Sequence, residues 1–217
     1  MIDRAPLKKG FYRSAKTEKV NTRKKGARMK IEAIRIVRVA MPLIYPFRTA
    51  FGNDDVIESV FVALTSAGVA GWGEAASWQR PAYGPECAAT QYIISRDVIA
   101  PQLLGQDIPS GTALQRCLGG VKGNDFAKAA FDLAWWDLYA RHCEKPLWQV
   151  LGGEQPVVSA GADFGVMERV PDLLESIRAA VEKGYARVKL KYRPGWEIDM
   201  VEQVRTAFPD TVFHVDC

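Results

Sequence analysis

The sequence predicts an α+β domain over residues 29–152, followed by a parallel α/β unit that begins near residue 153. Two observations predict this division. The first part opens with strand-like runs and continues with helical stretches, as α+β domains do. From residue 157 strands and helices alternate, with helices of roughly a dozen residues between near-continuous apolar strands. Such units build a parallel sheet, which is either doubly wound or closed into a barrel.

The first 28 residues differ from the rest in charge. Residues 1–28 contain ten of the 29 Lys and Arg residues but only two acidic ones, so the remainder is mildly acidic. The net charge of +4 is therefore no argument for a nucleic-acid-binding surface on the fold. We expect a basic disordered tail here. We favour an upstream extension before Met29 over a nucleic-acid-binding or acidic-partner tail or a targeting peptide.

The composition excludes several classes of protein. The chain has 217 residues, of which 48% are hydrophobic and 25% charged, as in an ordinary globular protein. No apolar run approaches the roughly 18 residues that a membrane-spanning helix needs. The four cysteines lack metal-ligand spacing, and we find no secretory apolar segment. We therefore expect free thiols and a cytoplasmic location.

The first part should begin with a three-stranded meander. Residues 29–43 alternate apolar and charged side chains, as a half-solvated antiparallel strand does. Residues 56–75 indicate two strands joined by a Ser-Ala-Gly turn. Residues 46–55 between them are rich in turn formers and predict a loop.

Helical stretches follow the meander. Residues 85–105 predict a helix that ends at Gly105, and residues 107–120 predict a shorter one. The clearest helix is expected over residues 124–142, where Asn124 is the candidate N-cap. We interpret its Trp135, Trp136 and Asp137 as core and interface residues, with the acid buried and paired locally.

In the second part we expect three strands with two helices between them. The strands are residues 157–165, 186–192 and 211–217, and the helices are residues 170–185 and 197–209. A TIM barrel needs eight strands, so a barrel would be less than half present.

Two lysines lie two residues apart in the central strand of this second part. Val188, Leu190 and Tyr192 should face the covering helices, which places Lys189 and Lys191 together on the other face. Burial and mutual repulsion would lower the pKa of both lysines, which is how an amine becomes a general base near neutral pH. The alternative is a solvated edge strand whose lysines prevent aggregation.

Asp216 ends the next predicted strand. Alone, an Asp after a strand is commonly a helix N-cap or a turn former. Beside two lysines it becomes a candidate ligand for a hard cation such as Mg²⁺, which prefers carboxylates. A cation beside a lysine base suits proton abstraction next to a carboxylate, because the cation stabilises the enediolate.

Several motifs occur together in one order and spacing. They are YPFRTAFG (45–52), GWGEA (71–75), AAFDLAWWDLYAR with KPLWQVLGG (129–153), VKLK (188–191), PGWE (194–197) and HVD (214–216). Together they resemble the muconate-lactonizing-enzyme subgroup of the enolase superfamily, most closely the amino-terminal portion of the o-succinylbenzoate synthase / N-succinylamino acid racemase family. The resemblance implies an α+β capping domain over residues 29–152. It also implies a truncated (β/α) TIM-type barrel over residues 153–217, with about three of eight strands.

The resemblance also implies roles for single residues. Lys191 matches the acid/base lysine of the family, Lys189 the lysine that assists it, and Asp216 the first of three acidic ligands of Mg²⁺. The other two ligands and the opposing lysine belong to later strands, so the metal site is incomplete in this chain. Asp163 stands where family members usually carry Ser, and its carboxylate would repel an anionic substrate.

The amino-terminal domain would supply two walls of the substrate pocket. One wall is a loop that closes over the substrate, and the other follows the GWGEA motif. For their aromatic residues, packing between the two domains is the alternative. Glu74 is either a pocket residue or a structural carboxylate. The two walls comprise Phe47, Arg48, Thr49 and Phe51, and then Trp78, Pro81 and Tyr83.

The implied activity is Mg²⁺-assisted proton abstraction α to a carboxylate. It would dehydrate a cyclohexadiene carboxylate to o-succinylbenzoate in menaquinone biosynthesis, racemise N-succinylamino acids, or both. A dipeptide epimerase, a muconate cycloisomerase-like enzyme and a non-catalytic truncated product are the alternatives. We expect a small-molecule carboxylate substrate, no nucleic-acid or membrane partner, and homo-oligomers among full-length members. We expect no turnover by these 217 residues alone.

Overall fold

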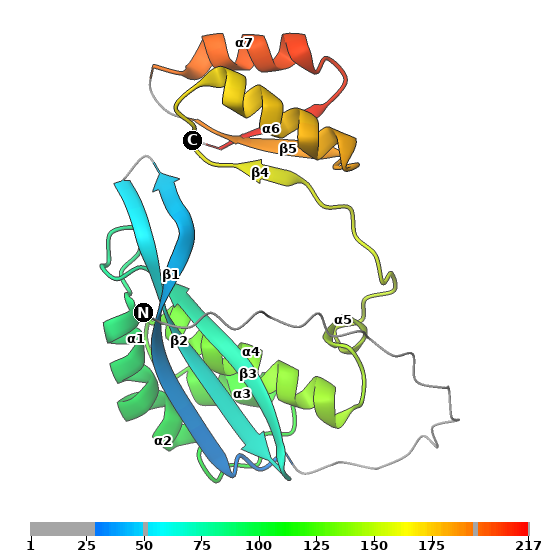
Figure 1. Cartoon of the computed structure of the whole chain (residues 1–217). Helices are drawn as coiled ribbons and strands as arrows, with labels where there is room; N and C mark the ends of the chain where they lie inside the picture. The colour runs from blue at the N-terminus through cyan, green and yellow to red at the C-terminus, as the bar shows by residue number, and fades with distance from the viewer. Residues whose placement is uncertain (1–28, 50–51, 193–194, 217) are drawn as a thin grey trace, which may run out of the picture.

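The computed structural model describes residues 29–49, 52–192 and 195–216, which form two sheets with their own helices (Figure 1). The expected basic tail over residues 1–28 and Phe51 lie outside the described residues. We call the sheet over residues 33–77 with the helices over residues 88–142 the antiparallel unit. We call the sheet and the two helices over residues 162–216 the parallel unit.

The antiparallel unit opens with a meander of β1 (Ala33–Thr49), β2 (Gly52–Ser66) and β3 (Val69–Ser77), in the order β1-β2-β3. The three-stranded meander is thus confirmed, but the loop expected over residues 46–55 is wrong. The backbone of Phe47 pairs with Asp54, after a shift of register that follows Pro42. Because a hairpin ladder satisfies backbone hydrogen bonds, the turn-forming residues extend the strands. The sequence expected as a loop is the tip of a long hairpin.

Helices cover one face of this sheet (Figure 1). The helix expected to end at Gly105 is present, and Gly105 has the positive φ of a helix stop, +79°. A π-helical segment, η1, interrupts this helix, which the sequence did not predict. The segments are α1 (Ala88–Ile94), η1 (Ser95–Ile99), α2 (Ala100–Leu103), α3 (Gly111–Leu118), α4 (Asp125–His142) and the short α5 (Leu147–Val150).

Helix α4 lies so close to β3 that two glycines are required. A Cβ on Gly71 would lie 2.2 Å from the backbone nitrogen of Leu138, and one on Gly73 would lie 2.0 Å from the carbonyl oxygen of Ala130. Buried Phe131 and Trp135 of the same helix fill the core against β2. The GWGEA motif therefore has a packing function.

A distant carboxylate caps α4. Asn124 occupies the N-cap position, but its side chain donates to the carbonyl of Lys122 and makes no capping bond. The backbone N–H groups of Phe126 and Ala127 instead donate to Glu86, at 2.9 and 3.1 Å. Asn124 therefore holds the predicted N-cap position, but a buried acid before α1, rather than the Asn124 side chain, satisfies the first helical donors.

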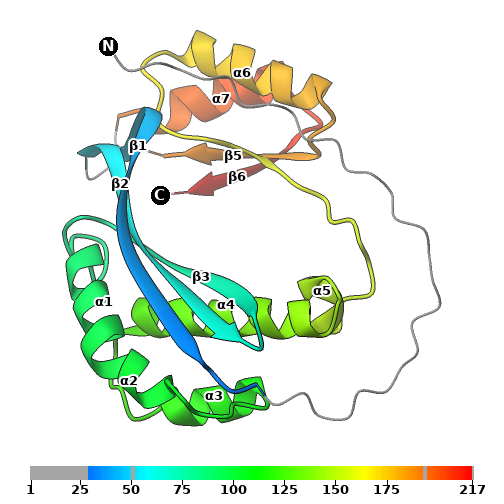
Figure 2. The same ribbon diagram turned by 60° about the horizontal axis from the view of Figure 1, so that its bottom comes forward.

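The parallel unit has the order β4-β5-β6, with α6 and α7 on the same face of the sheet (Figure 2). Its first strand has three residues and is shorter than expected. Val188 and Leu190 of β5 pack against the helices, as predicted, together with Ile177 and Met200. The elements are β4 (Ala162–Phe164), α6 (Val170–Glu182), β5 (Arg187–Lys191), α7 (Glu197–Ala207) and β6 (Val212–Asp216).

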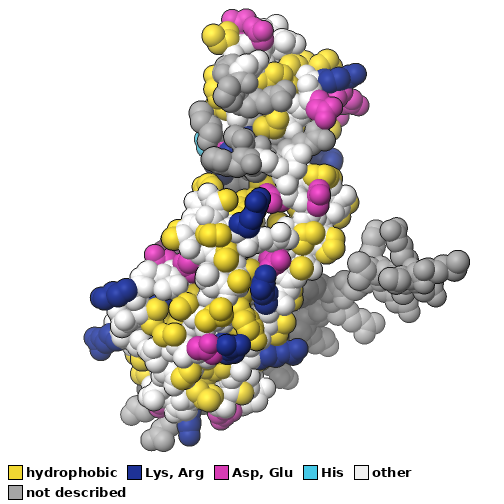
Figure 3. All heavy atoms as spheres, turned by 90° about the vertical axis from the view of Figure 1, so that its left-hand side faces the viewer, with side chains coloured by type: hydrophobic (Ala, Val, Ile, Leu, Met, Phe, Trp, Pro, Cys, Tyr) yellow, Lys and Arg dark blue, Asp and Glu magenta, His cyan; other side chains and the backbone are white. Residues whose placement is uncertain are grey.

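Two further features concern the surface. No helix in the described part of the chain is both long and apolar enough to cross a bilayer. On the face shown in Figure 3, basic and acidic side chains are interspersed with apolar ones over the antiparallel unit.

Candidate active site

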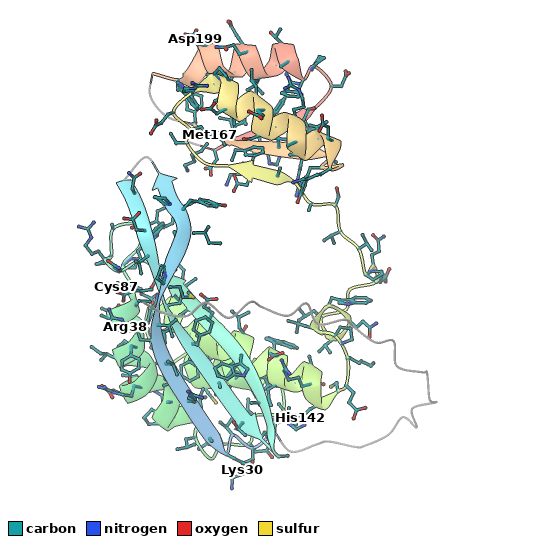
Figure 4. All side chains as sticks on the ribbon, in the orientation of Figure 1. Lys30, Arg38, Cys87, His142, Met167 and Asp199 are labelled. Atoms are coloured by element: carbon teal, nitrogen blue, oxygen red, sulfur yellow. The ribbon has the colours of Figure 1, made fainter. Side chains whose placement is uncertain are left out.

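The carboxyl ends of β5 and β6 point toward the tip of the β1–β2 hairpin (Figure 2). Between them lies a pocket of about 830 Å³, lined by residues of both units. The parallel unit contributes the loop after β4, which includes Met167 (Figure 4), and side chains at the ends of its strands. A pocket of this volume accommodates a small organic molecule.

Charged side chains line the floor of this pocket. In the parallel sheet Asp163 lies level with Lys189, and Lys191 lies level with Asp216. The Lys189 ammonium lies 2.8 Å from Asp216 Oδ2 and 3.4 Å from Asp163 Oδ2. The Lys191 ammonium lies 3.3 Å from the same Asp216 oxygen. The structure thus brings together the four residues of this sheet that the sequence singled out.

These side chains lie on the face of the sheet opposite α6 and α7, where they are partly exposed. The exposed fractions of the side chains are 40% for Lys189, 23% for Lys191 and 37% for Asp216. The hydrogen bond to Asp216 raises the pKa of Lys189 above its ordinary value, and the lysines in turn lower the pKa of Asp216. The expected lowering of the Lys189 pKa is wrong, because pairing with a carboxylate outweighs desolvation here.

The charged floor is not a complete metal site. Across residues 29–49, 52–192 and 195–216, no three His, Cys, Asp or Glu side chains gather closely enough to hold a metal ion. Asp216 offers a single carboxylate, and one of its oxygens lies near both ammonium groups. Mg²⁺ needs several oxygen ligands in octahedral geometry, so these residues alone do not fit it.

Aromatic residues form the wall that faces this floor. The rings of Phe47 and Trp78 stack with their centroids 6.1 Å apart, and Tyr83 is exposed beside them in the same pocket. Arg48 and Thr49 belong to the hairpin tip, where the structure describes their backbone pairing. Phe51 lies outside the described residues.

Some pocket residues were not predicted from the sequence. The hairpin tip adds Tyr45 and Asp54, and the loop after β3 adds Arg80. Tyr45 and Arg80 lie close in sequence to Phe47 and Trp78, and this proximity was the available signal. Asp54 belongs to the segment that was expected as a loop, so its place in the pocket depends on the hairpin that replaces that loop.

Two other expectations concerned residues outside the pocket. Trp135 is a core residue whose indole N–H donates to the carbonyl of Ile108 at 3.1 Å. Asp137 accepts hydrogen bonds from the Trp72 backbone and from Arg141, both at 2.9 Å. Asp137 therefore pairs locally as expected, but it is partly exposed rather than buried.

Comparison with protein families gives a match over the whole antiparallel unit and the first part of its connection to the parallel unit. The family described as mandelate racemase / muconate lactonizing enzyme, N-terminal domain, matches residues 30–152. This range includes β1–β3 and helices α1–α5.

Individual relatives extend the similarity into the parallel unit. An N-succinylamino acid racemase of Thermus thermophilus is 36% identical over 188 residues, which are 87% of this chain and 51% of the relative. An o-succinylbenzoate synthase of Geobacillus kaustophilus is 35% identical over 86% of this chain and 50% of its own length. The chain therefore spans about half the length of these curated relatives.

A solved structure shows the same arrangement. The crystal structure of an enolase-superfamily member from Enterococcus faecalis aligns with a TM-score of 0.78 at 34% sequence identity. The alignment covers 88% of this chain and 52% of that one.

Proposed function

This chain belongs to the mandelate racemase / muconate lactonizing enzyme family of the enolase superfamily, and we propose that it carries part of a proton-transfer site of an o-succinylbenzoate synthase or N-succinylamino acid racemase. The observation that carries the proposal is the meeting of Lys189, Lys191 and Asp216 under a pocket that both units line. In this proposal the parallel unit forms the first three strands of a (β/α) barrel.

The two lysines would have different functions in the proton transfer. Lys191 is the less exposed lysine at the carboxyl end of β5, and it would move the proton at the α-carbon of a carboxylate substrate. Lys189 lies two residues earlier in β5, and its positive charge would attract the substrate carboxylate. The aromatic wall of Phe47 and Trp78 would exclude water from the reacting atoms.

The described residues would supply a single ligand to a divalent cation. Asp216 would be one of its ligands, and the remaining ligands and the opposing base would come from polypeptide beyond the residues described here. The same Asp216 carboxylate pairs with both lysines in this structure, so binding of a cation would compete with these ion pairs.

The test is α-proton exchange. The coding sequence after codon 217 is read, and any continuation in frame is expressed with residues 1–217 as one protein. We expect this protein to exchange the α-proton of N-succinylamino acids in deuterated water, whereas residues 1–217 alone give no detectable exchange. Lys191→Ala should reduce exchange at least about 10³-fold, and Lys183→Ala on the exposed end of α6 should leave it unchanged.

Two results would contradict the proposal. One is exchange that survives Lys191→Ala. The other is a continuation that encodes neither acidic residues at later strand ends nor a distal lysine, which would favour a non-catalytic product.

A further inference from the structure

The helical run from α1 to α2 carries polar side chains on its buried face. Gln91, Ser95, Ile99 and Leu103 recur every four residues along this run, and all four are fully buried. In a regular α-helix residues four apart drift by about 40° around the axis, so such a row would soon turn away from the core. The π-helical segment η1 has more residues in a turn, which offsets this drift. It therefore keeps Ser95 facing the core.

Two polar atoms of this row lack a partner. Within the described part of the chain, neither Gln91 Nε2 nor Ser95 Oγ makes a hydrogen bond, although both atoms are buried. Gln91 Oε1 accepts a hydrogen bond from the Ser77 hydroxyl at 2.9 Å. Flipping the Gln91 amide would exchange its oxygen and nitrogen and would still leave one of them unpaired. Because an unpaired buried polar group destabilises a fold, these two atoms indicate a ligand.

The surroundings of the two atoms suit a very small ligand. Side chains four positions apart on a helix are neighbours, so the Gln91 amide and the Ser95 hydroxyl lie side by side. Helix α1 packs on β2 and β3, and buried Ala75 lies on the same face of β3 as Ser77. Ala88 is buried on the helix. These alanines fill little of the space between helix and sheet, and a water molecule needs only such a space with two to four polar partners.

We propose that Gln91 and Ser95 bind an internal water molecule between η1 and the sheet. The water accepts a hydrogen bond from the Gln91 amide nitrogen and exchanges a second one with the Ser95 hydroxyl, so both buried groups obtain a partner. Gln91, Ser95 and Ser77 are uncharged. The site therefore takes a neutral molecule, since a metal ion or an anion would lose its hydration there without gaining an opposite charge.

The water site joins the helical run to the end of β3. Gln91 binds the water through one amide atom and Ser77, the last residue of β3, through the other. Ser77 directly precedes Trp78, whose carbonyl accepts a hydrogen bond from the Ala88 backbone at 3.3 Å. The bound water thus holds together the strand end and the helix between which the loop after β3 begins. The site is separate from the charged floor of the pocket and does not require proton transfer there.

The decisive variant is Ser95→Ala, measured by urea titration of residues 1–217. Its hydroxyl makes no hydrogen bond to the described residues, so without a bound water its removal would leave the urea midpoint unchanged or raise it. With the water, Ser95→Ala breaks the bridge and leaves the Gln91 amide unpaired, and we expect the midpoint to fall by about 0.5 M. Gln102→Met, at an exposed position of α2, is the control and should leave the midpoint almost unchanged.

Magnetic relaxation dispersion of the solvent counts long-lived internal waters directly. We expect the dispersion amplitude to fall by about one water in Ser95→Ala and in Gln91→Met, and to stay unchanged in Gln102→Met. The double variant of Gln91 and Ser95 should lose less stability than the sum of the single variants, because it leaves neither group unpaired. The water site is overturned if the midpoint of Ser95→Ala is unchanged or raised, or if either single variant keeps the full amplitude. Unchanged far-UV circular dichroism confirms that each variant folds.

Discussion

The two units of the chain bury their sheets in different ways. In the antiparallel unit α4 lies so close to β3 that only glycine fits at two positions of the strand, and Phe131 and Trp135 are buried in the core. The parallel unit buries one face of its sheet under α6 and α7, while the opposite face holds a row of charged side chains, of which Asp163 is 65% exposed. The first unit therefore obtains its stability from packing, and the second keeps uncovered the face that carries the candidate site.

The largest effect should come from filling the contact between β3 and α4. In Gly73→Ala the new Cβ would overlap the backbone of Ala130, which cannot rotate away, so the helix must shift. We expect the free energy of unfolding of the antiparallel unit to fall by about 4 kcal/mol or more. Urea titration followed by peptide-level hydrogen exchange would assign the loss to this unit.

A matched glycine provides the control for this prediction. Gly120 has open space where a Cβ would lie and no positive φ, so Gly120→Ala should change the free energy of unfolding by less than about 0.5 kcal/mol. Equal effects of the two substitutions would contradict the close approach of α4 to β3.

The second prediction addresses the smaller core. Ile177 is fully buried between α6 and the sheet, and Ile177→Ala should destabilise the parallel unit by about 3 kcal/mol. Because the two cores share no buried residue among those that the structure describes, hydrogen exchange in β2 should stay unchanged while exchange in β5 accelerates. Simultaneous acceleration in both strands would show that the units unfold together.

The third prediction tests the distant cap of α4. Glu86→Ala removes the acceptor of two backbone N–H groups and should cost the antiparallel unit about 1–2 kcal/mol. Asn124→Gly keeps the left-handed backbone, φ 53°, and removes a side chain that makes no capping bond. Asn124→Gly should leave the urea midpoint almost unchanged. A larger loss of stability in Asn124→Gly than in Glu86→Ala would show that Asn124 caps the helix.

Several parts of the fold could be predicted because they depend on local patterns. The β-α-β-α-β order, the inward face of β5 and the helix ends at Gly105 and Gly184 follow from periodicity and from the conformational freedom of glycine. The placement of Lys189 and Lys191 beside Asp216 follows from the alternation of side chains in parallel strands.

Other parts depend on contacts between residues far apart in the chain. The cap by Glu86 joins residues separated by 40 positions, and no local pattern indicates it. The length of the β1–β2 hairpin could not be predicted from the sequence, because the residues near its tip are turn formers that are typical of a loop. The pKa of Lys189 depends on whether a carboxylate or bare apolar surface faces it, and the spacing of lysines does not reveal which.

The smallest expected effect is the pH dependence of the parallel unit. Pairing lowers the pKa of Asp216, so its stabilising contribution is present above the ordinary Asp value of about 3.9 and is lost as the pH falls through the lowered value. Pairing raises the pKa of Lys189, so its contribution is present below about 10.4 and is lost as the pH rises through the raised value. Stability from this pair should therefore be level between about pH 4 and pH 10.

Asp216→Asn removes the carboxylate on which the loss of stability in acid and the loss in base both depend. We expect the urea midpoint of the parallel unit to fall less steeply in acid for Asp216→Asn than for the unaltered chain, while the antiparallel unit responds identically in both proteins. Because the side chains are well exposed, solvent screens the pair and the difference should be small. If the urea midpoint falls equally steeply with decreasing pH in both proteins, the ion pair between Lys189 and Asp216 contributes nothing to holding β5 and β6 together.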